Sequence, residues 1–207
     1  RDLAMSTVGV IGTGYVGLTT AACMTRLGHT VVAADLDPDL VARLSKGEVG
    51  ILEDGLPELV AEGLASSQLS FVVGAAEAAR VSEFVFICVP TPQGSDGAAD
   101  LSFVDAATRE IAPVLRPGAV IVNKSTVPIG TTMRVRHRAV DAGATLDEFG
   151  VASNPEFLRE GHAVRDFLEP DRIVIGCDDP AVAVRVSELY ADTRAPTVVT
   201  NAASAEM

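Results

Sequence analysis

The chain has 207 residues, 48% of them hydrophobic, and a formal net charge of −12, so it can bury one substantial core, and its acidic balance argues against a nucleic-acid partner. Its apolar runs are too short to cross a bilayer, so no membrane contact is expected. Its three cysteines lie in apolar runs without CxxC spacing, which indicates core thiols in a reducing, cytoplasmic compartment.

Short apolar runs alternate with helical patterns along the chain. This alternation predicts an α/β fold: a Rossmann-like, doubly wound, mostly parallel sheet with helices on both faces, extended by an extra strand, helix and strand. The expected strands are 8–11, 30–34, 69–73, 84–89, 119–123, 150–153, 172–176 and 197–200, and the expected helices are 16–27, 38–45, 102–114, 130–142 and 181–191.

No repeat, low-complexity tract or Gly/Ser linker interrupts this pattern, so residues 1–201 are expected to form one domain. Residues 202–207 are interpreted as the first turn of a connecting helix that the end of the chain cuts. Residues 1–4, before Met5, are interpreted as an expression remnant.

A G-x-G-x-x-G pattern at Gly12, Gly14 and Gly17 follows the first expected strand and opens a helix. The first glycine allows a tight turn, the second lets the backbone approach a pyrophosphate, and the third lets the helix pack closely on the sheet. With Tyr15 and Val16, the helix N-terminus presents free N–H groups that favour an anion. This local attraction offsets the repulsion expected from the net negative charge.

The second expected strand ends at Asp35, eighteen positions after Gly17. A carboxylate in this place accepts hydrogen bonds from the adenosine ribose and would repel a 2′-phosphate, so NAD is preferred to NADP. The alternative is a structural strand-helix-strand unit with a solvated Asp35.

Two further segments follow the fourth and fifth expected strands. Pro90 and Thr91 lie in the first, and Ser125 and Thr126 in the second. Because ligands bind beyond the carboxyl ends of the strands in open α/β sheets, both segments are expected in the cofactor crevice. The prolines could equally end a strand, and the two hydroxyls could cap the helix that begins near Gly130.

The segment Asn-Pro-Glu-Phe-Leu-Arg-Glu-Gly at 154–161 follows the sixth expected strand. Its carboxylates, Glu156 and Glu160, stand at i and i+4, an arrangement that suits acid–base chemistry if one is desolvated. A helix start with acids in its first turn explains the pattern equally well.

These segments together resemble the UDP-glucose/GDP-mannose dehydrogenase family, and they cover essentially the whole chain. The matching elements are Gly-Thr-Gly-Tyr-Val-Gly at 12–17, Leu-Glu-Asp-Gly-Leu at 52–56, Cys-Val-Pro-Thr-Pro at 88–92, Ala-Asp-Leu-Ser at 99–102, Lys-Ser-Thr-Val-Pro-Ile-Gly-Thr at 124–131, the 154–161 segment and Pro-Asp-Arg-Ile-Val-Ile-Gly at 170–176.

The resemblance implies NAD-dependent, twofold oxidation of the C6 alcohol of a nucleotide sugar to a carboxylate, through an enzyme-bound aldehyde and a thioester. Pro-Asp-Arg-Ile at 170–173 favours UDP-glucose as the substrate, with GDP-mannose as the alternative. The full-length enzyme is then expected to be a homodimer or a larger homo-oligomer. No metal site is expected.

Roles follow from the resemblance position by position. Glu156 matches the acid–base glutamate, Glu160 the glutamate beside the nicotinamide amide, and Thr126 the residue that orders the hydrolytic water. The expected cofactor set is Gly12, Gly14, Tyr15, Val16, Gly17, Asp35, Pro90, Thr91, Ser125, Thr126 and Glu160. The expected substrate set is Glu156, Phe157, Leu158, Arg159 and Glu160.

Two departures qualify the resemblance. Leu40 stands where family members often carry a Lys or Arg, with Arg43 one turn further on, so adenosine binding is expected to be weaker or rebuilt. The family's catalytic cysteine, its lysine and asparagine, and its uridine-binding domain are expected beyond Met207. The chain alone is therefore expected to be inactive.

Two other classes remain as alternatives. A non-catalytic NAD-binding module would need only the phosphate loop and Asp35. A 3-hydroxyacyl or 6-phosphogluconate dehydrogenase would need a catalytic Lys or His after the fifth strand. This chain has Lys124 there, before Ser-Thr, and no histidine, and His29, His137 and His162 lie outside the motifs.

Overall fold

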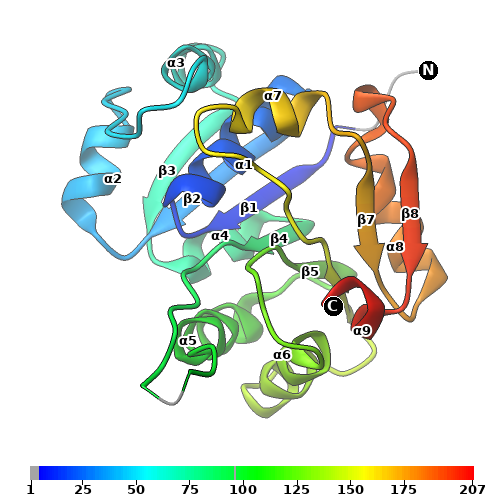
Figure 1. Ribbon diagram of the computed structural model, residues 1–207. Coiled ribbons are helices and arrows are strands. Elements are labelled where there is room, and N and C mark those ends of the chain that lie inside the picture. Colours follow the sequence, from blue (N-terminus) through cyan, green and yellow to red (C-terminus); the bar gives the residue numbers. More distant parts are fainter. Residues whose placement is uncertain (1–4, 96) are drawn as a thin grey trace.

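The computed structural model describes residues 5–95 and 97–207, so residues 1–4, interpreted above as an expression remnant, lie outside the described chain. Its strands form one eight-stranded sheet in the order β3-β2-β1-β4-β5-β6-β7-β8 (Figure 1). Neighbours from β3 to β6 are parallel, which confirms the predicted fold class. The strands are β1 Thr7–Ile11, β2 Thr30–Asp35, β3 Leu69–Val73, β4 Phe84–Ile87, β5 Ala119–Asn123, β6 Phe149–Ser153, β7 Ile173–Gly176 and β8 Thr197–Thr200.

Helices cover both faces of the sheet (Figure 1), because successive side chains of a buried strand point to opposite faces. In β4, Phe84 and Phe86 join one core cluster, whereas Val85 and Ile87 join the other. The first cluster packs against α1 (Tyr15–Arg26), α2 (Pro38–Leu44), α3 (Leu56–Ala65) and α7 (Ala163–Leu168), and the second against α4 (Ala75–Val81), α5 (Ser102–Ile111) and α6 (Thr131–Asp141). None of the helices in the described part of the chain has the length and apolarity needed to span a bilayer.

The helices α3, α4 and α7 were not predicted from the sequence. Each is short, with ten, seven and six residues, and helices of this length are stabilised mainly by tertiary packing. Three predicted boundaries also need correction: β4 ends at Ile87 instead of 89, the predicted helix 102–114 ends in a 3-10 turn, Ala112–Val114, and the predicted helix 181–191 ends at Glu188.

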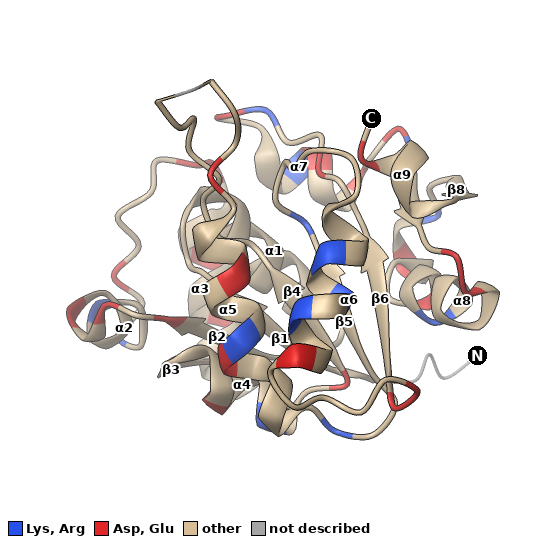
Figure 2. Ribbon diagram, turned by 90° about the horizontal axis from the view of Figure 1, so that it is seen from below, with Lys and Arg blue, Asp and Glu red and all other residues tan. Residues whose placement is uncertain are grey.

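The helices α5 and α6 lie side by side (Figure 2), and they share one buried carboxylate. Asp105 of α5 is 5% exposed and accepts hydrogen bonds of 2.8 and 2.6 Å from Nε and Nη2 of Arg134 in α6. Arg138 and Arg109 also approach it, at 3.6 and 4.0 Å. The hydrogen bonds from Arg134 and the charges of the other two arginines hold the pKa of this carboxyl below its usual value, so Asp105 links the two helices as a carboxylate.

Beyond β6 the sheet changes direction. The strand β7 is antiparallel to β6, with Ser153 paired to Gly176 in the described chain, and β8 is parallel to β7. Because this pairing joins the last residues of both strands, the start of β7 extends past the carboxyl end of β6. The remaining elements are α8 (Pro180–Glu188), the 3-10 turn Ala191–Thr193 and α9 (Ala202–Ala205). The start of β7 thereby forms a wall beside the crevice.

Candidate functional site

The three glycines of the phosphate loop have different surroundings. A Cβ built on Gly17 would lie 1.8 Å from the carbonyl oxygen of Gly12, and one built on Gly12, whose φ is +92°, would lie 2.8 Å from that of Cys88. A Cβ on Gly14 would meet no atom of the described chain within 4 Å. Gly12 and Gly17 are therefore required by packing, whereas Gly14 leaves an open approach to the backbone.

The N-terminus of α1 lies at this open approach. Gly14 is the N-cap and, within the described chain, no side chain caps the helix and no acid stands in its first turn. The N–H groups of Tyr15 and Val16 therefore belong to the unpaired first turn, where the helix dipole favours an anion. This arrangement fits the pyrophosphate of a dinucleotide.

Asp35 ends β2 beside the phosphate loop, as the sequence predicted. One oxygen, Oδ2, accepts hydrogen bonds from N and Oγ1 of Thr13 at 2.9 and 2.7 Å, and Oδ1 accepts one from the N–H of Asp37 at 3.1 Å. Burial favours the neutral acid, but these hydrogen bonds outweigh it and hold the pKa of Asp35 below its usual value. The carboxylate is thus charged and oriented. Thr13 was missed by the sequence analysis, although it occupies the first variable position of the glycine pattern.

The two crevice segments after β4 and β5 are tied to each other. Thr91 Oγ1 donates to the carbonyl oxygen of Thr126 at 2.8 Å, and Ser125 Oγ donates to that of Val89 at 2.7 Å. The alternative in which Ser125 or Thr126 caps α6 is wrong: Gly130 is the N-cap, and its N–H donates to the carboxylate of Glu206 at 2.6 Å. The hydroxyl groups of Thr91 and Ser125 therefore fix the crevice edge.

The 154–161 segment is not helical, and α7 begins only at Ala163. The helix-start alternative is therefore wrong, and Glu156 and Glu160 are not one helical turn apart. Glu156 is half-buried and its Oε2 accepts the N–H of Leu158 at 2.6 Å, whereas Glu160 is exposed. Glu156 lines a cavity of about 540 Å³, and Glu160 does not.

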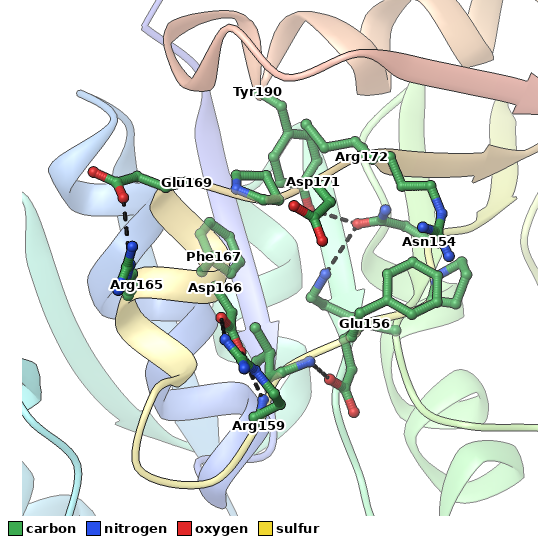
Figure 3. Close-up of a pocket in the computed structure, with 16 residues that line it drawn as sticks. Asn154, Glu156, Arg159, Arg165, Asp166, Phe167, Glu169, Asp171, Arg172 and Tyr190 are labelled. Atoms are coloured by element: carbon green, nitrogen blue, oxygen red, sulfur yellow. Dashed lines mark hydrogen bonds and ion pairs between the residues drawn. The ribbon is translucent and has the colours of Figure 1, made fainter.

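This cavity lies between the carboxyl ends of β5 and β6, the helix α7 and the protruding start of β7 (Figure 3). It contains four of the five predicted substrate residues and a set of charged side chains that the sequence analysis did not assign. Its lining includes Glu156, Phe157, Leu158 and Arg159, together with Lys124, Asn154, Arg165, Asp166, Phe167, Asp171, Arg172 and Tyr190.

Lys124 is a buried cation on the cavity wall. It is 4% exposed, its Nζ donates to Asn154 Oδ1 at 3.2 Å, and it lies 5.4 and 5.8 Å from the ring centroids of Phe167 and Tyr190. Burial lowers the pKa of Lys124 to about 8, against the opposing charge of Glu156 among others. A lysine directly after the buried strand β5 was the signal for this residue, which had been noted only as part of a motif.

Arg159 lines the cavity with its charge already paired. Its Nη2 and Nε donate to the two oxygens of Asp166 at 2.7 and 2.9 Å, and its backbone N–H donates to Oδ2 at 3.0 Å. The hydrogen bond from Arg159 lowers the pKa of Asp166 to about 2. The predicted substrate residue Arg159 therefore also stabilises the conformation of its own loop.

Glu53 is a second carboxylate that the sequence analysis did not assign. It is 6% exposed, accepts a hydrogen bond from the hydroxyl of Tyr15, and accepts the N–H groups of Gly161 and Val164 at 2.8 and 3.3 Å. Burial favours its neutral form, but these donors hold the pKa of Glu53 below its usual value. The motif at 52–56 thus contributes a buried charge between the phosphate loop and the 154–161 segment.

The cysteines match the prediction of core residues, since all three are free and buried. Burial raises the pKa of Cys23 and of Cys88 to about 12, and it also raises the pKa of Cys177. None of them lines the 540 Å³ cavity formed by the described residues.

Comparison with known proteins agrees with this geometry. Residues 6–194 match the model of the UDP-glucose/GDP-mannose dehydrogenase family, NAD binding domain, which supports the predicted cofactor. The chain is 41% identical over 203 residues to UDP-glucose 6-dehydrogenase TuaD of Bacillus subtilis, covering 98% of this chain and 44% of that protein. It is 48% identical over 172 residues to UDP-glucose 6-dehydrogenase of Rhizobium meliloti, covering 83% and 39%.

Solved structures show the same relationship. A UDP-glucose dehydrogenase from Pyrobaculum islandicum superimposes with a TM-score of 0.94 at 42% identity, covering 100% of this chain and 48% of that one. A GDP-mannose dehydrogenase from Pseudomonas aeruginosa gives a TM-score of 0.92 at 32% identity, covering 97% and 47%. The chain thus spans about half the length of the relatives it matches. It belongs to the UDP-glucose/GDP-mannose dehydrogenase family and corresponds to that family's NAD-binding domain.

Proposed function

We propose that this chain is the NAD-binding portion of a nucleotide-sugar dehydrogenase that oxidises the C6 alcohol of UDP-glucose to a carboxylate, with GDP-mannose as the alternative substrate. One observation carries the proposal: the phosphate loop touches the segment that lines the cavity. The N–H of Gly161 donates to the hydroxyl of Tyr15 at 3.1 Å, so a cofactor on the loop and a substrate in the cavity would be neighbours.

On the cofactor side, Gly14 and the free N–H groups of Tyr15 and Val16 hold the pyrophosphate, and the oriented carboxylate of Asp35 accepts the ribose hydroxyls. Pro90, Thr91, Ser125 and Thr126 form the edge of the nicotinamide crevice, supported by the bond between Thr91 and the Thr126 carbonyl. NAD supplies the hydride acceptor when it is bound. Glu160 is exposed between Arg159 and Gly161, whose backbones contact the hydroxyl of Tyr15, and it is proposed to contact the nicotinamide amide.

On the substrate side, Glu156 removes or holds a proton at the reacting alcohol or water, because its carboxylate lines the cavity. Its bond to the N–H of Leu158 fixes one oxygen. The backbone of Phe157 and Leu158 holds the nucleotide sugar, and Thr126 orders the hydrolytic water. The buried ammonium of Lys124 stabilises negative charge in the same cavity.

Three further assignments complete the proposal. Residues 1–201 form the NAD-binding domain, supported by the family match over 6–194. The full-length enzyme works as a homodimer or a larger homo-oligomer, as the family resemblance implies. It works in the cytoplasm, supported by three buried cysteines that form no disulfide.

Titration calorimetry of the chain with NAD and NADP tests the cofactor side. NAD should bind more tightly, and Asp35→Asn should weaken NAD binding by about 10- to 100-fold, the range for a hydrogen bond to a charged group. The same substitution should reduce the difference between the affinities for NAD and NADP. Asp39→Asn is the matched control, because it removes an exposed acid on the neighbouring helix α2. Equal or tighter NADP binding by the unsubstituted chain would refute the role of Asp35.

The catalytic assignment is tested in the protein encoded by the complete gene. Replacing Glu156 by Gln should slow turnover by about 10²- to 10⁴-fold, the usual range for a general acid–base group, and a covalent sugar adduct should accumulate on the enzyme. Intact-protein mass spectrometry detects this adduct. Normal turnover without an adduct would remove Glu156 from catalysis. Binding of NAD without any response to UDP-glucose or GDP-mannose would favour the non-catalytic module.

A further inference from the structure

Glu53 is a buried carboxylate whose hydrogen-bond partners come from two distant parts of the chain. One partner, Tyr15, opens α1 at the phosphate loop. The others are the N–H groups of Gly161, just before α7, and of Val164, in the first turn of α7. Glu53 itself lies just before α3. A buried charge normally needs such partners, because leaving it unpaired would cost several kcal/mol.

Tyr15 contacts the same segment directly. Its hydroxyl accepts the N–H of Gly161 at 3.1 Å and lies at hydrogen-bonding distance, 3.3 Å, from the carbonyl oxygen of Arg159. Burial and the hydrogen bond to Glu53 raise the pKa of Tyr15 to about 12, so the phenol is neutral and keeps its proton. A charged acceptor forms the stronger bond, so the proton of Tyr15 is directed to Glu53.

The backbone of Tyr15 and its side chain therefore face two different sites. The backbone N–H lies in the unpaired first turn of α1, where the pyrophosphate is proposed to bind. The side-chain hydroxyl contacts the backbone of Arg159 and Gly161. Residues 156–159 of the same segment line the cavity. A shift of the first turn of α1 on cofactor binding would move the phenol, and the phenol shares Glu53 with the 159–164 backbone.

We infer that Tyr15 and Glu53 form a positioning pair that couples the cofactor loop to the substrate segment, so that bound NAD orders residues 159–164. This inference rests on the proposed function, because it takes NAD as the ligand of the loop. Both residues act through the backbone they hold and touch no reacting atom. The pair makes cofactor and nucleotide-sugar binding interdependent, and linkage requires this dependence to be reciprocal.

A purely structural contact predicts a different behaviour. Such a contact would protect the amides of Gly161 and Val164 equally with and without cofactor. Coupling instead predicts extra protection of these two amides when NAD binds, and it predicts that the extra protection depends on Tyr15 and Glu53. The measurable quantity is the ratio of exchange rates with and without NAD. A substitution that destabilises the free and the NAD-bound chain equally leaves this ratio unchanged.

Amide hydrogen exchange of the chain, read by NMR or by peptide mass spectrometry over 159–164, measures this ratio. At saturating NAD, so that altered affinity does not enter, exchange at Gly161 and Val164 should slow on the order of tenfold, a typical coupling factor. In Tyr15→Phe and in Glu53→Gln the ratio should fall to about one. Glu58→Gln, an exposed acid on α3, should keep the tenfold ratio.

Each result decides between the two explanations. If the chain shows no NAD-dependent protection although calorimetry shows binding, or if both variants keep the protection, the coupling inference is wrong and the proposed function is untouched. If the unsubstituted chain does not bind NAD, the proposed function is wrong, and the coupling inference that rests on it is wrong as well. Should Glu53→Gln prove unfolded by circular dichroism, Tyr15→Phe decides alone, because it removes only a hydroxyl.

Discussion

The phosphate loop and the 154–171 segment meet at one edge of the sheet but are held in place by different forces. In the loop, backbone approaches backbone: a Cβ at Gly17 would lie 1.8 Å from a carbonyl oxygen. In the segment, charged side chains hold the chain, as Asp166 holds Arg159 and Glu53 holds Gly161. Steric contacts fix the glycine turns of the first region, whereas charged side chains fix the second region.

This difference predicts opposite sensitivities. The turns at Gly12 and Gly17 should not tolerate an added methyl group, because their close contacts leave no room for a Cβ. The segment should tolerate changes in side-chain volume but not the loss of a carboxylate, because its turns depend on charge-assisted hydrogen bonds. Three experiments test this comparison, beginning with the largest expected effect.

The largest effect is expected from Gly17→Ala. The new methyl group would clash with the Gly12 carbonyl, and Gly12 is itself held by the hydrogen bond from its N–H to the carbonyl oxygen of Ala34 at 2.8 Å. The free energy of unfolding, measured by urea denaturation, should fall by more than about 4 kcal/mol, beyond the range of most single substitutions. Gly14→Ala is the matched control: it should change stability by less than about 1 kcal/mol yet abolish tight NAD binding. A Gly17→Ala chain of normal stability would contradict the steric account.

Thiol reactivity gives the second test, because Cys88 lies directly under the loop. At pH 8 a pKa of about 12 instead of the usual 9.0 leaves about 1,000-fold less thiolate at Cys23 and Cys88. Both thiols should react with a disulfide reagent at least 100-fold more slowly in the folded chain than in denaturant. Fast modification of either thiol in the folded chain would show that this region opens readily.

The smallest effect concerns Asp166 and its pairing with Arg159. Because the folded pKa of Asp166, about 2, lies below the usual value, its stabilising contribution is present above about pH 4 and is lost as the pH falls towards 2. Amide exchange at Arg159, corrected for its intrinsic pH dependence, should speed up over this window by a few fold. At neutral pH, Asp166→Asn should have a similar effect on exchange and on tryptic cleavage after Arg159. Asp192→Asn, which removes an exposed acid on the 3-10 turn Ala191–Thr193, serves as the control, and equal rates in all three chains would contradict the charge account.

The contrast between steric contact and charge pairing also explains why the sequence predicted the phosphate loop better than the 154–171 segment. Steric demands are local, so the glycine spacing and Asp35 at the end of β2 can be recognised without a structure. Charge pairing in the segment is not local: Glu53 meets Tyr15 across 38 positions and Gly161 across 108. No spacing rule connects such residues, so Glu53 and the hydroxyl of Tyr15 received no role.

Two other errors have related causes. The i, i+4 spacing of Glu156 and Glu160 suggested a helical turn, but the segment is not helical and α7 starts only at Ala163. Lys124 was passed over because its burial depends on Asn154, Phe167 and Tyr190, which lie on other elements. The general fold was predictable from alternating patterns, whereas the short helices α3, α4 and α7 depend on packing that the sequence does not display.

The change of strand direction after β6 has a consequence for cooperativity. In the described chain β6 and β7 pair only at Ser153 and Gly176, while β7 and β8 share a ladder of four pairs. The β7–β8 ribbon is therefore expected to open as a separate unit, at a lower free energy than the six-stranded parallel part. The cavity spans this seam, which the bond from Asn154 Nδ2 to the Val174 carbonyl closes at 2.9 Å. Partial opening of the ribbon would then widen the cavity while the phosphate loop keeps its shape.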